Sequence, residues 1–163
     1  MWKHSRAAIA NEKLDFVLVH LPLPHPPGIY DRRTGRIGPG GGYVDNLALA
    51  DRTLAELEQV IAGTHSAQQT TLVISSDHGW RIPLWRHEVG WTNEDETVAR
   101  SRGFVFDTRP VLIVRFPNEA APAQVSRPLP LLDMHDILEQ IVSGKIASAD
   151  QLDAWAAAQP SGK

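Results

Sequence analysis

The chain contains no cysteine. This absence excludes disulfides, thiolate metal sites and a cysteine nucleophile within these residues. The sequence also lacks an apolar run long enough to cross a bilayer. Its first ten residues, MWKHSRAAIA, have no continuous apolar core of the kind that a signal peptide needs. We therefore expect neither a membrane segment nor a signal peptide in this chain, and the composition leaves its compartment open.

A strong excess of one charge is absent as well. The 16 lysines and arginines nearly balance the 19 aspartates and glutamates, which gives a net charge of −3. No basic stripe runs along the sequence, so we do not expect nucleic acid as a partner. Apolar residues make up 42% of the 163 residues, which is enough for one domain with its own core. We therefore predict a single domain over residues 1–163.

Short apolar segments alternate with helical periodicity along the chain. Bounded apolar runs predict strands buried on both faces, as in parallel sheets, and apolar residues at steps of three and four predict helices. The predicted strands are 15–20, 70–76 and 110–116, and the predicted helices are 45–62, 133–142 and a short one after Ser148. Strand, helix and strand in succession indicate a parallel crossover. We therefore predict an α/β fold with a mostly parallel sheet flanked by helices.

The long helix and the loop before it carry more specific signals. Asp45 is a suitable N-cap for helix 45–62, and Leu47 falls on its apolar face together with Leu57. Residues 22–42 hold five prolines and six glycines and predict a loop. The GPGGG stretch of this loop lacks the Lys-Ser/Thr pair of a phosphate-binding loop, so we interpret it as a flexible linker.

Histidines and one carboxylate follow the predicted strands. The stretch TLVISSDHGW ends the second strand with Asp77 and His78, and His87 follows shortly after. His20 and His25 come after the first strand. Because ligands bind outside the carboxyl ends of parallel strands, we expect these side chains to converge. Aspartate oxygen and imidazole nitrogen suit zinc, whereas oxygen-rich sites suit calcium, magnesium or manganese.

Each of these residues also has an ordinary structural explanation. The SDHG stretch could be a plain turn, and His20 could pack at the end of its strand. His25 and His87 could be exposed loop residues. His135 lies in the first turn of a predicted helix, where a cation would oppose the helix dipole, so we interpret it as neutral and structural.

Several segments together resemble one family. FVLVHLPLPHPPGIYDRRTG, YVDNLALADRTLAELEQVI, TLVISSDHGW, RPVLIVRFPN and LPLLDMHDILEQIV occur in this order. They resemble the alkaline phosphatase superfamily, most closely its sulfatase-like and phosphoethanolamine-transferase-like branches. The resemblance covers residues 13–142, and residues 143–163 remain as a short helix and tail. It implies an alkaline-phosphatase-like fold, and it covers only the C-terminal half of the family's catalytic domain.

The resemblance also implies roles for single residues. Asp77 and His78 would bind a divalent metal ion, which could be zinc, calcium, manganese or magnesium. His25 would match a loop histidine that contacts the substrate or a second metal, and His87 would match a histidine after the Asp-His-Gly turn; both would be catalytic. The looser matches concern contacts to an anionic ester substrate: Tyr30, Arg32 and Arg33.

The family's nucleophile has no match in this chain. Members begin with a strand that supplies acidic metal ligands, followed by a Thr, Ser or modified Cys nucleophile, and this chain has no such motif. We therefore expect the metal-binding half of a sulfatase-like hydrolase or transferase, whose partner is the missing N-terminal half of the catalytic domain. The alternative is a non-catalytic remnant or module of the same fold. A Ser-His-Asp hydrolase is a weaker hypothesis because no Gly-x-Ser-x-Gly elbow is present.

Overall fold

The structure is a computed structural model of the chain, and it describes residues 2–104, 109–117, 119, 125 and 129–159. Two compact units make up the chain. Unit 1 consists of Met1–Thr64 and His78–Arg109, and unit 2 of His65–Asp77 and Pro110–Lys163. The expectation of a single domain over residues 1–163 stays a prediction.

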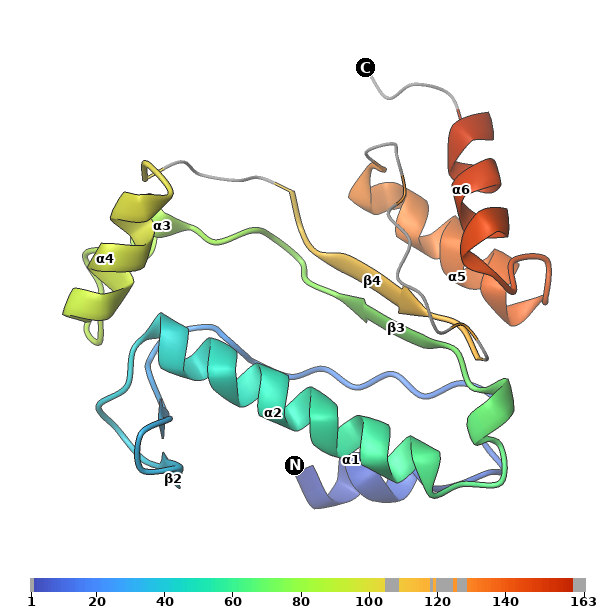
Figure 1. Cartoon of the computed structure of the whole chain (residues 1–163), viewed down its shortest axis with the longest axis horizontal. Helices are drawn as coiled ribbons and strands as arrows, with labels where there is room; N and C mark the ends of the chain where they lie inside the picture. The colour runs from blue at the N-terminus through green and yellow to red at the C-terminus, as the bar shows by residue number, and fades with distance from the viewer. Residues whose placement is uncertain (1, 105–108, 118, 120–124, 126–128, 160–163) are drawn as a thin grey trace. The chain divides into compact units, whose positions relative to one another are not determined.

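Helices are the main regular structure of unit 1. Its elements are α1 (Trp2–Ile9), β1 (Tyr30–Asp31), β2 (Arg36–Ile37), α2 (Tyr43–Ala62), α3 (Ile82–Trp85) and α4 (Asn93–Ser101), as Figure 1 shows. The predicted helix 45–62 is confirmed as α2, with Leu57 and Ile61 buried. Its N-cap is Gly42 rather than Asp45, which instead accepts a hydrogen bond from the Gly42 backbone N–H at 3.2 Å.

The glycines before α2 are packed closely against neighbouring atoms. Gly41 and Gly42 are both buried. A Cβ on Gly42 would lie 2.1 Å from an oxygen of Asp95, and a Cβ on Gly41 would lie 1.8 Å from the Tyr30 carbonyl oxygen. Only glycine leaves room for this backbone approach. The interpretation of GPGGG as a flexible linker is therefore wrong for its last two residues.

The predicted strand 15–20 is not a strand in the structure. The segment has no hydrogen-bonded neighbour strand, and the one sheet in the described part of unit 1 is the two-residue pairing of β1 with β2. Its side chains still alternate: Val17 and Val19 are half-buried, while Phe16 and Leu18 are 55% and 81% exposed. The apolar pattern alone did not supply the partner strand that a buried strand requires.

Unit 2 combines a two-stranded sheet with helices. Its elements are a 3₁₀ turn (Ala67–Gln69), β3 (Leu72–Ser75), β4 (Leu112–Arg115), a second 3₁₀ turn (Leu131–Asp133), α5 (Met134–Val142) and α6 (Ala149–Ala158). The predicted strands 70–76 and 110–116 and the predicted helices 133–142 and after Ser148 are confirmed. The unit has its own core, formed by Phe116, Ile137, Ile146 and Leu152.

The predicted mostly parallel, alkaline-phosphatase-like sheet is wrong. β3 pairs with β4 in antiparallel register, with Leu72 opposite Arg115 and Ser75 opposite Leu112. β1 and β2 are also antiparallel, so the described residues contain no parallel pair. The physical reason is that segment 15–20 forms no strand, so α2 does not connect two strands of one sheet.

Within the described residues, no helix combines the length and the apolar character that a membrane span needs.

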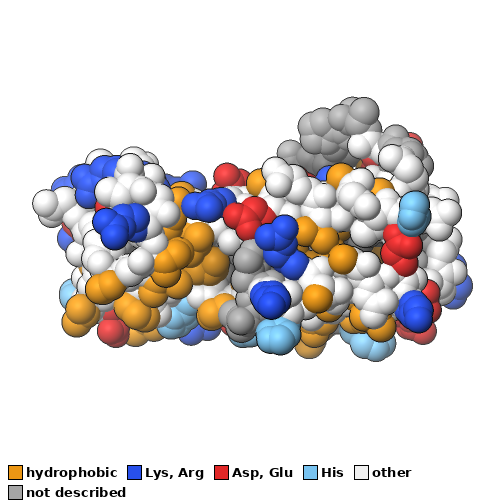
Figure 2. Space-filling view, turned by 90° about the horizontal axis from the view of Figure 1, so that it is seen from below, with side chains coloured by type: hydrophobic (Ala, Val, Ile, Leu, Met, Phe, Trp, Pro, Cys, Tyr) orange, Lys and Arg blue, Asp and Glu red, His pale blue; other side chains and the backbone are white. Residues whose placement is uncertain are grey.

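Apolar side chains also reach the surface. The face drawn in Figure 2 carries groups of exposed apolar side chains among scattered charges. The most exposed large apolar residues are Val89, Leu132 and Leu18.

Candidate functional site

Trp85 brings together two of the predicted site histidines in unit 1. This indole, at the end of α3, is only 6% exposed. The His25 ring meets it edge to face, with ring centroids 5.2 Å apart, and the His78 ring meets it in the same manner at 5.7 Å. Two histidines far apart in the sequence therefore share one packing partner.

Both imidazoles are oriented by a neighbouring backbone carbonyl. Nδ1 of His25 lies 2.6 Å from the Pro26 oxygen, and Nδ1 of His78 lies 2.7 Å from the Gly79 oxygen. Because a carbonyl oxygen can only accept, Nδ1 carries the proton in each contact. The lone pair of each neutral ring is then on Nε2, which is the atom for binding a metal or taking a proton.

A group of aromatic rings surrounds this contact. The Tyr43 ring stacks on Trp80 with centroids 4.5 Å apart, and Trp80 meets Trp91 at 5.8 Å. Burial raises the pKa of Tyr43 to about 12.

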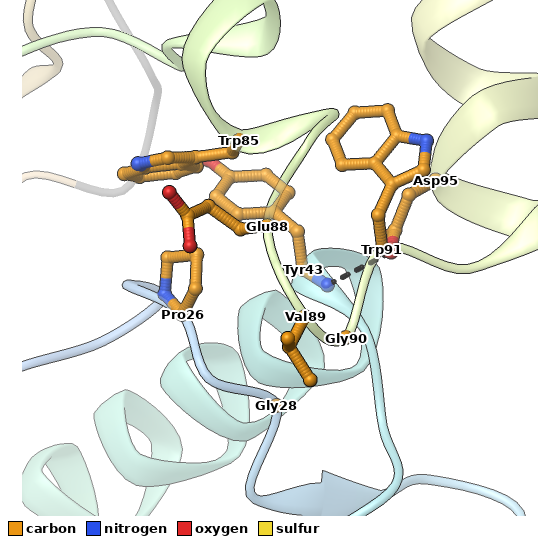
Figure 3. A pocket seen from close by; sticks show the side chains of 9 residues that line it. All are labelled: Pro26, Gly28, Tyr43, Trp85, Glu88, Val89, Gly90, Trp91 and Asp95. Atoms are coloured by element: carbon orange, nitrogen blue, oxygen red, sulfur yellow. Dashed lines mark hydrogen bonds between the residues drawn. The ribbon is translucent and has the colours of Figure 1, made fainter.

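Figure 3 shows Tyr43 and Trp85 beside the small cavity that they line together with Pro26, Gly28, Glu88, Val89, Gly90, Trp91 and Asp95. The cavity holds about 10 Å³, room for roughly one water molecule, so it is too small for an ester substrate.

Asp95 fixes the two helices that border this cavity. The carboxylate is completely buried and accepts hydrogen bonds from the Tyr43 and Val44 backbone N–H groups at 3.2 and 2.9 Å, the first of which is drawn in Figure 3. It also accepts from the backbone N–H and the hydroxyl of Thr92, each at 2.9 Å. One side chain therefore caps the N-termini of both α2 and α4, where the helix dipole favours a negative charge.

The residues predicted to meet an anion are placed differently from one another. Tyr30 is buried, and its hydroxyl receives a hydrogen bond from Arg52, which raises the pKa of Arg52. Arg32 is paired with Asp45 at 3.4 Å and with Glu94. The Arg33 side chain is 89% exposed, in the turn between β1 and β2. Of the three side chains, that of Arg33 is the most exposed, and its Nε lies 3.8 Å from a carboxylate oxygen of Asp31.

The remaining predicted residues do not join the Trp85 contact. His87 is exposed just after α3, and no ring contact or hydrogen bond of the described residues links it to His25 or His78. His20 is exposed in the segment without strand pairing. Asp77 is exposed. It is the last residue of segment His65–Asp77 of unit 2, and the next residue, His78, belongs to unit 1.

A second group of possible metal ligands lies on α5 in unit 2. His135, Asp136 and Glu139 could hold a metal ion, since one ligand atom from each lies within 4.8 Å of the others. All three are exposed. The hydrogen bond from His135 Nδ1 to Asp136, at 3.0 Å, raises the pKa of His135. The neighbouring carboxylate therefore favours the charged imidazolium, which differs from the neutral histidine expected from the helix dipole.

Three buried residues of the site were given no role in it by the sequence analysis: Asn46, Trp85 and Asp95. A signal existed for two of them. Thr92 and Asp95 have the spacing of a capping box, and the structure contains that box. Asn46 and Ala50 are four residues apart and therefore lie on the same, buried face of α2. A polar side chain on that face needs hydrogen-bond partners. Nothing in the local pattern distinguishes Trp85 from its neighbours Trp80 and Trp91.

Comparison of the chain with models of protein families, with curated proteins and with solved structures gives no match.

Proposed function

We propose that this chain carries the metal-binding part of a hydrolase or transferase that acts on sulfate or phosphate esters. The proposal starts from the resemblance of residues 13–142 to sulfatase-like and phosphoethanolamine-transferase-like enzymes. It rests on residues and contacts of the chain and not on a shared parallel sheet, which the described residues do not contain.

The shared contact of His25 and His78 with Trp85 is the observation that carries the proposal. The resemblance assigns one of these histidines to the metal and the other to the substrate, so the two have to lie near each other. They come from segments on either side of α2 in the sequence. Their contact with one indole is not a consequence of sequence neighbourhood, and it supports a common site.

The chemistry of the donor atoms fits a divalent cation. Asp77 offers carboxylate oxygens, and His78 offers Nε2 once Nδ1 is held by the Gly79 carbonyl. Such an ion would supply Lewis-acid polarisation of the ester oxygen. Two protein ligands are fewer than the three or four of stable zinc sites, so binding to this chain alone is expected to be weak.

The other residues of the proposed site act on the ester itself. His25, with its lone pair on Nε2 when neutral and a proton there when charged, would give a proton to the leaving oxygen or take one. His87 would serve in the same way from the exposed segment after α3. The Arg33 guanidinium would pair with oxygens of the anionic group. Tyr30, which is buried against Arg52, would contribute by holding the loop that carries Arg33.

The alternative function is a non-catalytic module that binds a metal ion. It is favoured for the chain in isolation by one observation, the lack of a recognisable nucleophile in the sequence. In the catalytic proposal, a separate polypeptide segment supplies that nucleophile and further acidic ligands.

Calorimetric titration with zinc, manganese, calcium and magnesium tests the metal site. Because the α5 cluster could also hold an ion, the experiment uses a His135→Ala background that weakens that cluster. Adding Asp77→Ala and His78→Ala to this background should lower the affinity for at least one of the ions by about tenfold or more, since no ligand of the proposed pair remains.

The His135→Ala variant by itself is the matched control, and we expect it to keep the binding that depends on Asp77 and His78. Equal binding by the control and the triple variant would remove Asp77 and His78 from any metal site and overturn the proposal. Loss of all binding with His135→Ala alone would assign the metal to α5 instead.

A further inference from the structure

Asn46 is the most completely satisfied buried polar side chain near the His25 loop. It lies in the first turn of α2 and has no exposed surface. Its Nδ2 lies 3.4, 3.0 and 3.1 Å from the carbonyl oxygens of Pro24, His25 and Pro27. Its Oδ1 accepts a hydrogen bond from the Ile29 backbone N–H at 2.9 Å. A single carboxamide therefore contacts four backbone groups of one loop.

The loop around His25 has few means of holding itself in place. Pro24, Pro26 and Pro27 lack a backbone N–H, so they cannot donate to a turn or to a neighbouring strand. The carbonyl groups of the loop still need donors where water is excluded. The Asn46 amide supplies donors to the carbonyls of Pro24, His25 and Pro27, and the loop conformation is thereby tied to α2.

The position of the His25 ring follows from this attachment. The His25 carbonyl is itself an Asn46 partner at 3.0 Å, and the ring of the same residue meets Trp85. His78 meets the same indole from the other segment. At the same end of α2, Asp95 accepts hydrogen bonds from the Tyr43 and Val44 N–H groups and links this end to α4. The first turn of α2 thus anchors both the His25 loop and α4.

We propose that Asn46 is a positioning residue that holds the His25 ring against Trp85, the indole that His78 also contacts. A catalytic role for the positioned His25 rests on the function proposed above. The position of the His25 ring depends only on contacts within this chain. Asn46 does not touch substrate in this role. It acts by holding the carbonyls of the proline loop, so that the His25 ring stays against Trp85.

Nuclear magnetic resonance of histidine-labelled protein tests this directly. The Trp85 ring current displaces the carbon-bound proton signals of both imidazoles, and a His25→Gln variant assigns the His25 signal. In Asn46→Asp, the carboxylate keeps an acceptor for Ile29 but has no donor for the three carbonyls. We expect the His25 signal to lose most of its displacement while the His78 signal keeps its own.

Gln59→Glu is the matched control, because it makes the same amide-to-carboxylate change at an exposed position of the same helix. It should leave both signals unchanged. A folded Asn46→Asp variant with an undisturbed His25 signal would overturn the proposal. A general loosening of the fold would move the His78 signal as well, so a purely structural role is distinguished from positioning.

The wild-type protein gives a second measurement if Asn46→Asp fails to fold. The Ile29 amide, bonded to Asn46 Oδ1, should exchange with solvent as slowly as the amides of α2, and fast exchange would overturn the proposal. Neither measurement uses a metal or a substrate. Failure of the metal titration would therefore leave the positional claim standing, and failure here would leave the metal site standing.

Discussion

Asp95 shows how much structure one buried carboxylate can hold. Its two oxygens accept hydrogen bonds from the N-termini of α2 and α4, and no part of the side chain is exposed. Hydrogen bonds to a charged group contribute about 1.5–3 kcal/mol each, and loss of one partner leaves buried N–H groups without acceptors. We expect Asp95→Asn to lower the free energy of unfolding by about 2–4 kcal/mol, measured by urea denaturation.

The neighbouring Glu94 provides the comparison for this prediction. Glu94 pairs with Arg32 at the surface, and its side chain is 48% exposed. Exposed ion pairs contribute little to stability because water and salt screen them. Glu94→Gln should therefore shift the urea midpoint much less than Asp95→Asn, and equal shifts would contradict the assignment of Asp95 as a shared cap.

Tyr43 predicts a loss of stability at alkaline pH. Burial raises its pKa from an ordinary 10.0 to about 12, so the folded state binds the phenol proton more tightly than the unfolded state. The contribution to stability is then fully present below pH 10 and is lost as the pH rises through about 12. Tyr43→Phe should remove this part of the pH dependence of unfolding. Absorbance of the tyrosinate checks the pKa, and a Tyr43 phenol that titrates near 10 would contradict the prediction.

At the scale of elements, the sequence predicted helix α2 but not which residues of its first turn are buried. Apolar spacing located the helix, and Leu57 and Ile61 are buried as that spacing requires. Leu47 is 49% exposed, whereas Asn46 beside it is completely buried. The reason is that the first turn faces the carbonyl groups of a proline loop and not apolar side chains. Periodicity of hydrophobic residues has no information on such a polar contact.

Strand pairing was the other feature that local patterns could not provide. Segment 15–20 keeps an alternation of half-buried and exposed side chains, yet it has no strand partner among the residues that the structure describes. β3 and β4 have similar local sequences and do pair with each other. The difference lies in long-range hydrogen bonds, which depend on where other segments lie. The polar helix α4 was missed because it has few apolar residues to show a period.

The unpaired segment predicts self-association of the chain. Phe16 and Leu18 are 55% and 81% exposed on a segment whose backbone has no strand partner in the described part of the chain, and such segments pair readily with other chains. We expect Leu18→Lys to reduce association in sedimentation velocity by placing a charge on this surface. The control is Val89→Lys, since Val89 is 91% exposed in a loop of the same unit. Equal effects of both variants would show that general charge, and not segment 15–20, governs association.

For the whole molecule, part of the site was predictable from the chain and part was not. The Asp-His pair is a local motif that the sequence shows directly, and its role as a metal site stays a prediction. The approach of His25 to His78 was expected from a parallel sheet. The structure shows that each of the two rings contacts Trp85, and the approach of one histidine to the other stays a prediction. Asn46 and Asp95 belong to the same arrangement and are visible only once the loops are folded. Buried polar contacts between distant segments are the part that residue patterns cannot specify.

The last prediction is that the isolated chain does not hydrolyse sulfate or phosphate esters. The proposed site contains imidazoles and a metal-binding pair but no residue that we can assign as nucleophile. A well-oriented nucleophile accounts for about 7–11 kcal/mol of the barrier in such reactions, so its absence should reduce turnover to the background rate.

Purified residues 1–163 are assayed with an aryl sulfate and an aryl phosphate in the presence of zinc, manganese, calcium or magnesium, beside an Asp77→Ala control. Turnover by the wild-type chain that disappears in Asp77→Ala would contradict the prediction and would locate a nucleophile within this sequence. Turnover that both proteins share would indicate a contaminant or a reaction of the free metal. Background rates from both proteins, together with metal binding by the wild type alone, would agree with a chain that holds the ion and depends on another segment for the attacking group.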